Sequence, residues 1–186
     1  MSDPCRRRSV LKLALALGLG LPRAASGQDP RRARPQRNDR FVFGGGERKG
    51  QLVTPADVPA GGRPFTAYPL DPATNTLRDD SRLNEVLLVR LDPAALQGDT
   101  RARAAEGIVG YSAICTHTGC DAWEWQPAAS VLKCSCHFSE FALADGARVL
   151  NGPAPRRLPA LPLTIVDGAL VVADGFVGRP GFESSG

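Results

Sequence analysis

Two short runs in the C-terminal half constrain this chain more than any other feature. The first is C-T-H-T-G-C at residues 115–120, and the second is C-S-C-H-F-S at residues 134–139. Thiolate and neutral imidazole are side chains that bind iron well. Since the C-x-H spacing is too tight for one face of a helix, the first run predicts a loop around one edge of a metal centre. The C-x-x-H of the second run supplies the opposite edge.

Each run offers one Cys and one His as ligands. They are Cys115 with His117, and Cys134 with His137. In a two-iron cluster, two thiolates can hold one iron and two imidazoles the other. Neutral imidazoles remove negative charge from the cluster, so the reduced state is reached more easily than in a cluster held by four Cys. The residues therefore predict a centre that moves single electrons.

Two other readings of the same residues stay open. A zinc site is one, because two Cys and two His are also a zinc ligand set. Zinc fingers pair Cys with Cys and His with His, however, whereas each run here mixes the two. A domain held only by two disulfides is the other reading, but it leaves both histidines of the chain unexplained beside the cysteines.

With these runs the chain resembles the Rieske [2Fe–2S] proteins, in their disulfide-containing branch. The resemblance implies an all-β Rieske fold, in which an antiparallel β-sandwich carries a smaller cluster-binding subdomain, and one [2Fe–2S] cluster per chain. It also implies a bridging disulfide and a proline-bearing loop over the cluster. The implied positions are Cys115, His117, Cys134 and His137 as iron ligands, Cys120 and Cys136 as the disulfide, and Gly152, Pro153, Ala154 and Pro155 as the loop.

Within that family, residues 110–162 resemble the small subunit of arsenite oxidase. The likeness rests on Tyr111–Ser112 before the first run and on C-S-C-H-F-S-E-F at residues 134–141. It implies a periplasmic heterodimer with a molybdopterin-containing large subunit, and a cytochrome c or a copper protein as electron acceptor. The alternatives are a quinol-oxidising complex of the cytochrome bc type and a stand-alone periplasmic Rieske carrier.

Three residues beside the ligands are expected to adjust the centre. In the bc type, the family resemblance implies that a Ser and a Tyr hydroxyl donate hydrogen bonds to cluster sulfur, which raises the potential. Ser139 keeps the first donor, whereas Phe141 cannot supply the second, so we expect a potential below that of the bc type. Phe138 stands where the bc type has Gly, and we expect it to shape the docking patch.

No substrate site of its own is expected in this chain. The sequence has neither a P-loop nor a dinucleotide fingerprint, and its two histidines are both assigned to iron. The substrate chemistry is therefore expected on a partner, and the chain is expected to act as an electron-transfer subunit.

The N-terminus predicts export by the twin-arginine pathway to the periplasm. Arg7–Arg8 opens the signal, an apolar run covers residues 13–21, and small residues follow at 24–27, so residues 1–27 are assigned to the signal peptide. Nine apolar residues fall short of the roughly 20 that span a bilayer, and no permanent span is expected. Loss of the leader removes Cys5, which leaves two cysteines for iron and two for one bridge.

The charge divides the chain in two. Residues 1–40 hold ten Lys/Arg against three Asp/Glu, whereas the remainder holds thirteen against sixteen. We assign residues 28–45 to a flexible basic arm, and the pattern does not favour nucleic-acid binding. Residues 46–186 are assigned to the Rieske domain, with the cluster-binding part at about 108–158.

Apolar runs in that domain predict strands. They cover residues 85–91, 107–114, 131–133, 163–166 and 169–173, with Asp-Gly turns at 145–146 and 167–168. Asp92 is expected to cap a single helical turn over residues 93–96. Residues 44–64 are rich in Gly and Pro and are expected to be irregular.

Overall fold

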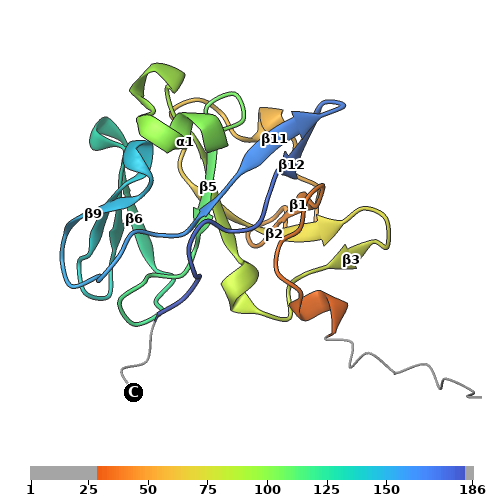
Figure 1. Ribbon diagram of the computed structural model, residues 1–186, viewed down its shortest axis with the longest axis horizontal. Coiled ribbons are helices and arrows are strands. Elements are labelled where there is room, and N and C mark those ends of the chain that lie inside the picture. Colours follow the sequence, from red (N-terminus) through yellow and green to blue (C-terminus); the bar gives the residue numbers. More distant parts are fainter. Residues whose placement is uncertain (1–28, 183–186) are drawn as a thin grey trace, which may run out of the picture.

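The computed structural model describes residues 29–182 (Figure 1). Most regular structure there is antiparallel β-sheet, so the prediction of an all-β protein is confirmed. The predicted signal peptide, with Cys5, lies outside the described residues. Among the described helices, none has the length and apolar character needed to cross a bilayer.

A six-stranded sheet forms the centre of the molecule. Its strands follow the order β1–β2–β4–β5–β10, with β3 added on β2. The bounds are β1 Arg40–Phe43, β2 Phe65–Asp71, β3 Thr76–Leu77, β4 Val86–Arg90, β5 Ile108–Ser112 and β10 Ala160–Leu161. Long-range pairing, such as β5 with β10, brings the segments on either side of the cluster-binding region together.

A four-stranded sheet and a hairpin complete the fold on opposite sides of the central sheet (Figure 1). The strands are β6 Trp123–Gln126, β7 Val131–Cys134, β8 Glu140–Ala142 and β9 Arg148–Asn151 in the sheet, and β11 Leu163–Val166 and β12 Ala169–Val172 in the hairpin. The helices are α1 Gly98–Arg103 and the 3₁₀ turns η1 Pro30–Arg32, η2 Pro55–Asp57, η3 Arg82–Asn84, η4 Pro93–Ala95, η5 Pro127–Ala129 and η6 Leu143–Asp145.

Strand β4 is buried on both faces, and this fixes the order of the layers. Successive side chains of a strand point to opposite faces. Val86 and Leu88 enter a core shared with β1 and the hairpin, including Leu170. Leu87 enters a second core, shared with Phe141 of the four-stranded sheet. The central sheet is therefore the common wall of two cores.

Several predicted elements are found where the pattern placed them. The predicted strands at 85–91, 107–114, 131–133, 163–166 and 169–173 correspond to β4, β5, β7, β11 and β12. Asp167 and Gly168 both have positive φ, as a two-residue hairpin turn requires. Asp92 caps η4 through a 2.9 Å hydrogen bond from the Ala94 amide.

The N-terminal segment differs from the expected arm where the structure describes it. Arg40–Phe43 forms β1 and pairs with β2. Asp39 is buried and accepts hydrogen bonds from Arg78 at 2.7 and 3.1 Å. A run rich in Arg predicts a solvated segment, but a buried ion pair with a residue 39 positions away cannot be read from local composition. Helix α1 was not predicted either, since six residues carry too little periodic signal.

Candidate metal centre

Two loops at one end of the four-stranded sheet carry the predicted ligands. The first cluster loop, residues 115–120, lies between β5 and β6, and the second cluster loop, residues 134–139, joins β7 to β8. Each loop closes on itself through backbone hydrogen bonds, because the amide of the fifth residue donates to the carbonyl of the leading Cys. These bonds are Gly119 N to Cys115 O at 3.0 Å and Phe138 N to Cys134 O at 2.9 Å.

The two leading cysteines are free and buried. Cys115 and Cys134 are each 1% exposed, whereas the other two cysteines of the loops form a disulfide. Burial raises the pKa of the Cys115 thiol to about 11, and the neighbouring Cys134 thiol adds to the shift. A thiolate in such surroundings requires a cation beside it, which a bound metal supplies.

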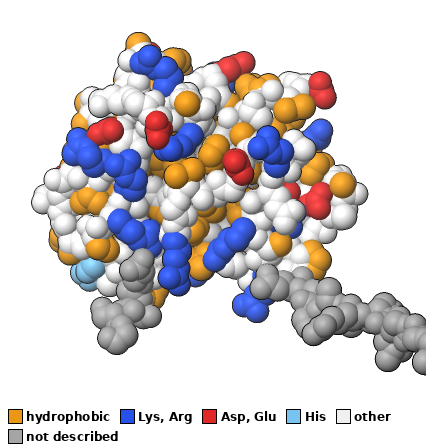
Figure 2. All heavy atoms as spheres, viewed as in Figure 1, with side chains coloured by type: hydrophobic (Ala, Val, Ile, Leu, Met, Phe, Trp, Pro, Cys, Tyr) orange, Lys and Arg blue, Asp and Glu red, His pale blue; other side chains and the backbone are white. Residues whose placement is uncertain are grey.

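The two histidines lie against each other. The ring centroids of His117 and His137 are 4.6 Å apart, with the rings nearly perpendicular. His117 Nδ1 is buried without a hydrogen-bond partner among the described residues. His137 is exposed, and Figure 2 shows histidine atoms at the surface of the molecule, at the lower left. A buried nitrogen without a partner fits a metal ligand, because an unpaired polar group in the interior is otherwise costly.

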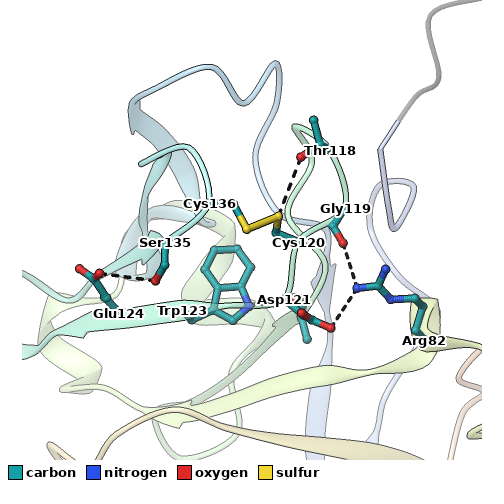
Figure 3. The surroundings of a disulfide bond; sticks show 10 residues. Arg82, Thr118, Gly119, Cys120, Asp121, Trp123, Glu124, Ser135 and Cys136 are labelled. Atoms are coloured by element: carbon teal, nitrogen blue, oxygen red, sulfur yellow. Dashed lines mark hydrogen bonds and ion pairs between the residues drawn. A yellow bond between two sulfur atoms is a disulfide. The ribbon is translucent and has the colours of Figure 1, made fainter.

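The disulfide implied by the family resemblance is present. Cys120 of the first loop is bonded to Cys136 of the second (Figure 3). The Cys134 sulfur lies within 4.8 Å of both disulfide sulfurs. That group of three sulfurs is not itself a metal site, since Cys120 and Cys136 are bonded to each other and offer no thiolate.

The proline-bearing loop packs directly on the second cluster loop. Gly152 has a φ of 88°, and a Cβ there would lie 2.5 Å from the Cα of Ser139, so only Gly permits this approach. The Ala154 amide donates to Ser139 Oγ at 3.0 Å. Ser139 thus uses its oxygen as an acceptor and keeps its hydroxyl proton to donate. Pro153 and Pro155 flank Ala154 and are exposed.

The two phenylalanines beside the ligands occupy different surroundings. Phe141 is fully buried and packs edge to face on Trp123, with ring centroids 5.8 Å apart. Trp123 is held in turn by a 2.8 Å hydrogen bond from its indole nitrogen to Ala113 O. Phe138 is 58% exposed, has a φ of 61°, and lies under the Lys133 ammonium at 5.0 Å. Phe141 is therefore core, and Phe138 is surface.

Sequence reasoning missed three residues that hold the first cluster loop. Thr116 is buried and donates to the Arg156 carbonyl at 2.6 Å. Arg82 donates to the Gly119 carbonyl at 2.9 Å and forms an ion pair with Asp121 (Figure 3). Thr116 stands between two ligands and could have been singled out, whereas Arg82 and Arg156 reach the loop from 37 and 40 positions away.

The donor set fits a [2Fe–2S] cluster with mixed ligands. The two loops bring two buried free thiols and two adjoining imidazoles to the same end of the molecule. Iron takes both donor types, and the disulfide leaves no further thiol in the loops to compete. A zinc-finger arrangement is disfavoured, because each loop contributes one donor of each type.

Comparisons with known proteins agree with this geometry. The family model of the Rieske [2Fe–2S] domain matches residues 84–162. The cytochrome bc1 complex Rieske iron–sulfur subunit of Streptomyces lividans is 35% identical over 131 residues, which cover 69% of this chain and 76% of the relative. The putative respiratory nitrate reductase subunit Rieske of Haloferax mediterranei is 39% identical over 74 residues, or 40% of this chain and 33% of the relative.

Among solved structures, the chain is similar to the soluble domain of Rieske protein II from Sulfolobus acidocaldarius. The two share 23% identity over 54% of this chain and 66% of that chain, with a TM-score of 0.42. The Streptomyces relative is described as a bc1 subunit and the Haloferax relative as a putative nitrate reductase subunit, so the arsenite oxidase assignment stays a prediction. The match to the domain and the extent of the bc1 relative show that this chain belongs to the Rieske iron–sulfur protein family, whose domain carries a [2Fe–2S] cluster.

Proposed function

We propose that this chain transfers single electrons through a [2Fe–2S] cluster held by four residues of the two loops. The ligands in this proposal are Cys115, His117, Cys134 and His137. The observation that carries it is that two loops joined by a disulfide hold both free thiols and a pair of adjoining imidazoles, with His117 Nδ1 left without a partner among the described residues. When bound, such a cluster accepts one electron and gives it up again.

The protein residues divide the remaining tasks. His137 is exposed, so in this proposal its ring is the ligand that would face a partner's redox centre. The Cys120–Cys136 disulfide holds the two loops together. The Ser139 hydroxyl, oriented by the Ala154 amide, can donate to cluster sulfur, and such a bond favours the reduced state.

The relatives favour a respiratory complex of the bc type as the setting. In this proposal the chain takes electrons from a quinol-oxidising site and passes them to a cytochrome c. The support is the Streptomyces lividans relative, a cytochrome bc1 complex subunit that matches over 69% of this chain. In this proposal the complex supplies the substrate chemistry, and this chain supplies the electron transfer.

A second setting is favoured by two side chains of the second loop. Phe138 and Phe141 stand where the resemblance gives Gly and Tyr to the bc type. They support a small subunit of a molybdopterin oxidoreductase of the arsenite oxidase kind, with a cytochrome c or copper protein as acceptor. The Haloferax mediterranei relative, named as a nitrate reductase subunit, also supports a partner outside the bc type.

One purification separates these settings. The native protein is enriched from membranes and from the soluble fraction, reduced, and measured by electron paramagnetic resonance. A rhombic signal with low average g supports the cluster, and a zinc-loaded, diamagnetic protein contradicts it. A response of that signal to a quinol-site inhibitor supports the bc setting. Co-purification with a molybdenum-containing subunit supports the second setting instead.

We also propose that the chain is exported by the twin-arginine pathway and works in the periplasm. The support is the Arg7–Arg8 pair with the short apolar run that follows it. That pathway carries folded proteins, which suits a chain loaded with its cluster before export. Replacing both arginines with Lys should keep the holoprotein in the cytoplasm, and unchanged periplasmic recovery would contradict the proposal.

A further inference from the structure

The last described residues, 177–182, form a strap that leaves the central sheet and ends at the first cluster loop. Val177 exchanges backbone hydrogen bonds with Ala160 of β10 at 2.8 and 3.2 Å. The strap then turns at Gly181, where a Cβ would lie 2.8 Å from a Leu83 methyl carbon. Figure 1 shows this end of the chain descending to the loops at the lower left. The C-terminal strap thus runs from β10 of the central sheet to the first cluster loop.

Arg156 connects the C-terminal strap to the first cluster loop. Its guanidinium donates to the carbonyls of Arg179 and Gly181, both at 2.7 Å. Its own carbonyl accepts the 2.6 Å hydrogen bond from Thr116, which lies between the proposed ligands Cys115 and His117. Charged donors make stronger hydrogen bonds than neutral ones. Arg156 therefore links the C-terminal strap to the first cluster loop, although the two segments lie far apart in the sequence.

The C-terminal strap returns to the same loop through Phe182. A Cβ placed on Gly119 would lie 2.7 Å from a ring carbon of Phe182, so the ring packs directly on the Gly119 backbone. From the other direction Arg82 donates to the Gly119 carbonyl (Figure 3). Gly119 is buried as a result, although it lies on a loop. A closed circuit runs from Thr116 through Arg156 and the strap to Phe182 and back to Gly119.

We propose that Arg156 and Phe182 are positioning residues that hold the first cluster loop and keep water away from its backbone, and that the midpoint potential depends on them. This inference rests on the proposed electron-transfer function. The reduced cluster carries more negative charge than the oxidised one, and solvent exposure is among the factors that set its potential. Water admitted beside Gly119 stabilises the reduced state, so loss of the Phe182 ring raises the potential.

Three changes to the full-length holoprotein test the proposal. They are Phe182→Ala, Arg156→Gln and a chain ending at Gly178. The matched controls are Val166→Ala, whose side chain is 45% exposed against 48% for Phe182 but lies on the hairpin, and a chain ending at Phe182. We expect an upward shift of the midpoint potential in the three test proteins and no shift in the two controls.

A second readout does not require the cluster. The rate at which a phosphine or thiol reagent reduces the Cys120–Cys136 disulfide is followed by alkylation and mass spectrometry, in both metal-loaded and metal-free protein. Cys120 follows Gly119 directly, so we expect a several-fold faster reduction in the test proteins. Test proteins with wild-type potential and wild-type reduction rate would overturn the proposal. A test protein that binds no cluster is judged by this rate alone, and an unchanged rate overturns the proposal there too.

The two proposals fail in different ways. A wild-type protein without the electron paramagnetic resonance signal of a reduced cluster contradicts electron transfer. The same protein can still show faster disulfide reduction on loss of Phe182, which supports the positioning role of the C-terminal strap.

Discussion

The two cluster loops have the same pattern of backbone hydrogen bonds, but different segments of the molecule pack on them. In each, the fifth residue has positive φ and donates its amide to the first carbonyl, and the first amide donates to the sixth carbonyl. The second set of bonds is Cys115 N to Cys120 O at 2.7 Å and Cys134 N to Ser139 O at 2.8 Å. The side chains are exchanged between the loops. The third residue is His117 in one and Cys136 in the other, and the disulfide joins unlike positions.

The fifth residue shows the contrast most clearly. In the first loop it is Gly119, with a φ of 82°, buried under Phe182. In the second loop it is Phe138, with a φ of 61° and more than half of its side chain exposed. At this position the first loop packs against the C-terminal strap, whereas the second loop presents a side chain to solvent. The same backbone conformation can therefore bury a glycine in the first loop and expose an aromatic side chain to a partner in the second.

The largest expected effect is loss of iron binding, and we expect it from a change in either loop. Replacing Cys115 or Cys134 by Ser should abolish iron binding in both cases, since each loop holds one of the two thiols proposed as ligands. Iron per chain and visible absorption measure the loss. Cys5→Ser is the control and should keep full iron content, because Cys5 falls in the predicted leader. A Ser variant of either loop that retains the iron would break the proposed equivalence.

The next largest effect is a loss of stability when the disulfide between the loops is removed. Replacing both Cys120 and Cys136 by Ser should lower the free energy of unfolding by about 3 kcal/mol, because the bridge closes a loop across a separation of 16 residues. Urea denaturation of the metal-free protein measures this. Either single replacement should match the double one. A loss below about 1 kcal/mol would mean that other contacts already restrain the unfolded chain.

A methyl group at the fifth position tests the anchored loop. Gly119→Ala should lower the free energy of unfolding by about 2 kcal/mol, from the positive φ and from contact with the Phe182 ring. Gly168→Ala is the matched control, because Gly168 has a φ of 76° and open space around it. Its loss should be about 1 kcal/mol, from backbone strain alone. Equal losses at the two positions would argue against close packing of Phe182.

The midpoint potential should depend on Phe141, the buried residue of β8 that follows the second cluster loop. Phe141→Tyr should raise the midpoint potential, because a hydroxyl there can donate to cluster sulfur and stabilise the reduced state. Ser139→Ala is the opposing control and should lower it. Redox titrations followed spectroscopically compare both with wild type. A Tyr variant with an intact cluster and no upward shift would contradict the account of Phe141.

The smallest effect is expected in the presented loop. Phe138→Gly relieves the strain of positive φ but loses the contact with Lys133 and makes the unfolded chain more flexible. These terms oppose one another, so the free energy of unfolding should change by less than about 0.5 kcal/mol. Electron-transfer kinetics with the partner should change instead. A large stability loss with unchanged kinetics would reverse the roles given to the two loops.

Local patterns predicted the elements that local chemistry specifies. Continuous apolar runs located β4 and β5, and the Asp167–Gly168 pair located the last hairpin, because both signals depend on residues that are neighbours in the sequence. The spacing of Cys and His likewise indicated the two cluster loops. The proposed ligand assignment itself remains a prediction until a loaded protein is measured.

The contacts that hold the loops were not predictable in the same way. Arg156 was one of many arginines in the sequence, and its role depends on the strap lying beside the proline-bearing loop. Strand β1 was not predicted because it follows a run rich in Arg. Its position is set by pairing with β2 and by the buried Asp39–Arg78 ion pair. Such contacts arise from tertiary packing and leave no periodic trace in a single sequence.

The double burial of β4 has a consequence for how the family's domain can be inherited or transplanted. A segment cut at the expected cluster-binding limits, 108–158, would leave behind Leu87 and Val89, which pack against Leu132 and Phe141 in one core. The family match begins at residue 84 and ends at residue 162, and so retains β4, β5 and β10 together. The smallest portable unit is therefore the pair of loops together with the wall behind them. We expect hydrogen exchange to show that wall and the four-stranded sheet opening as one cooperative block.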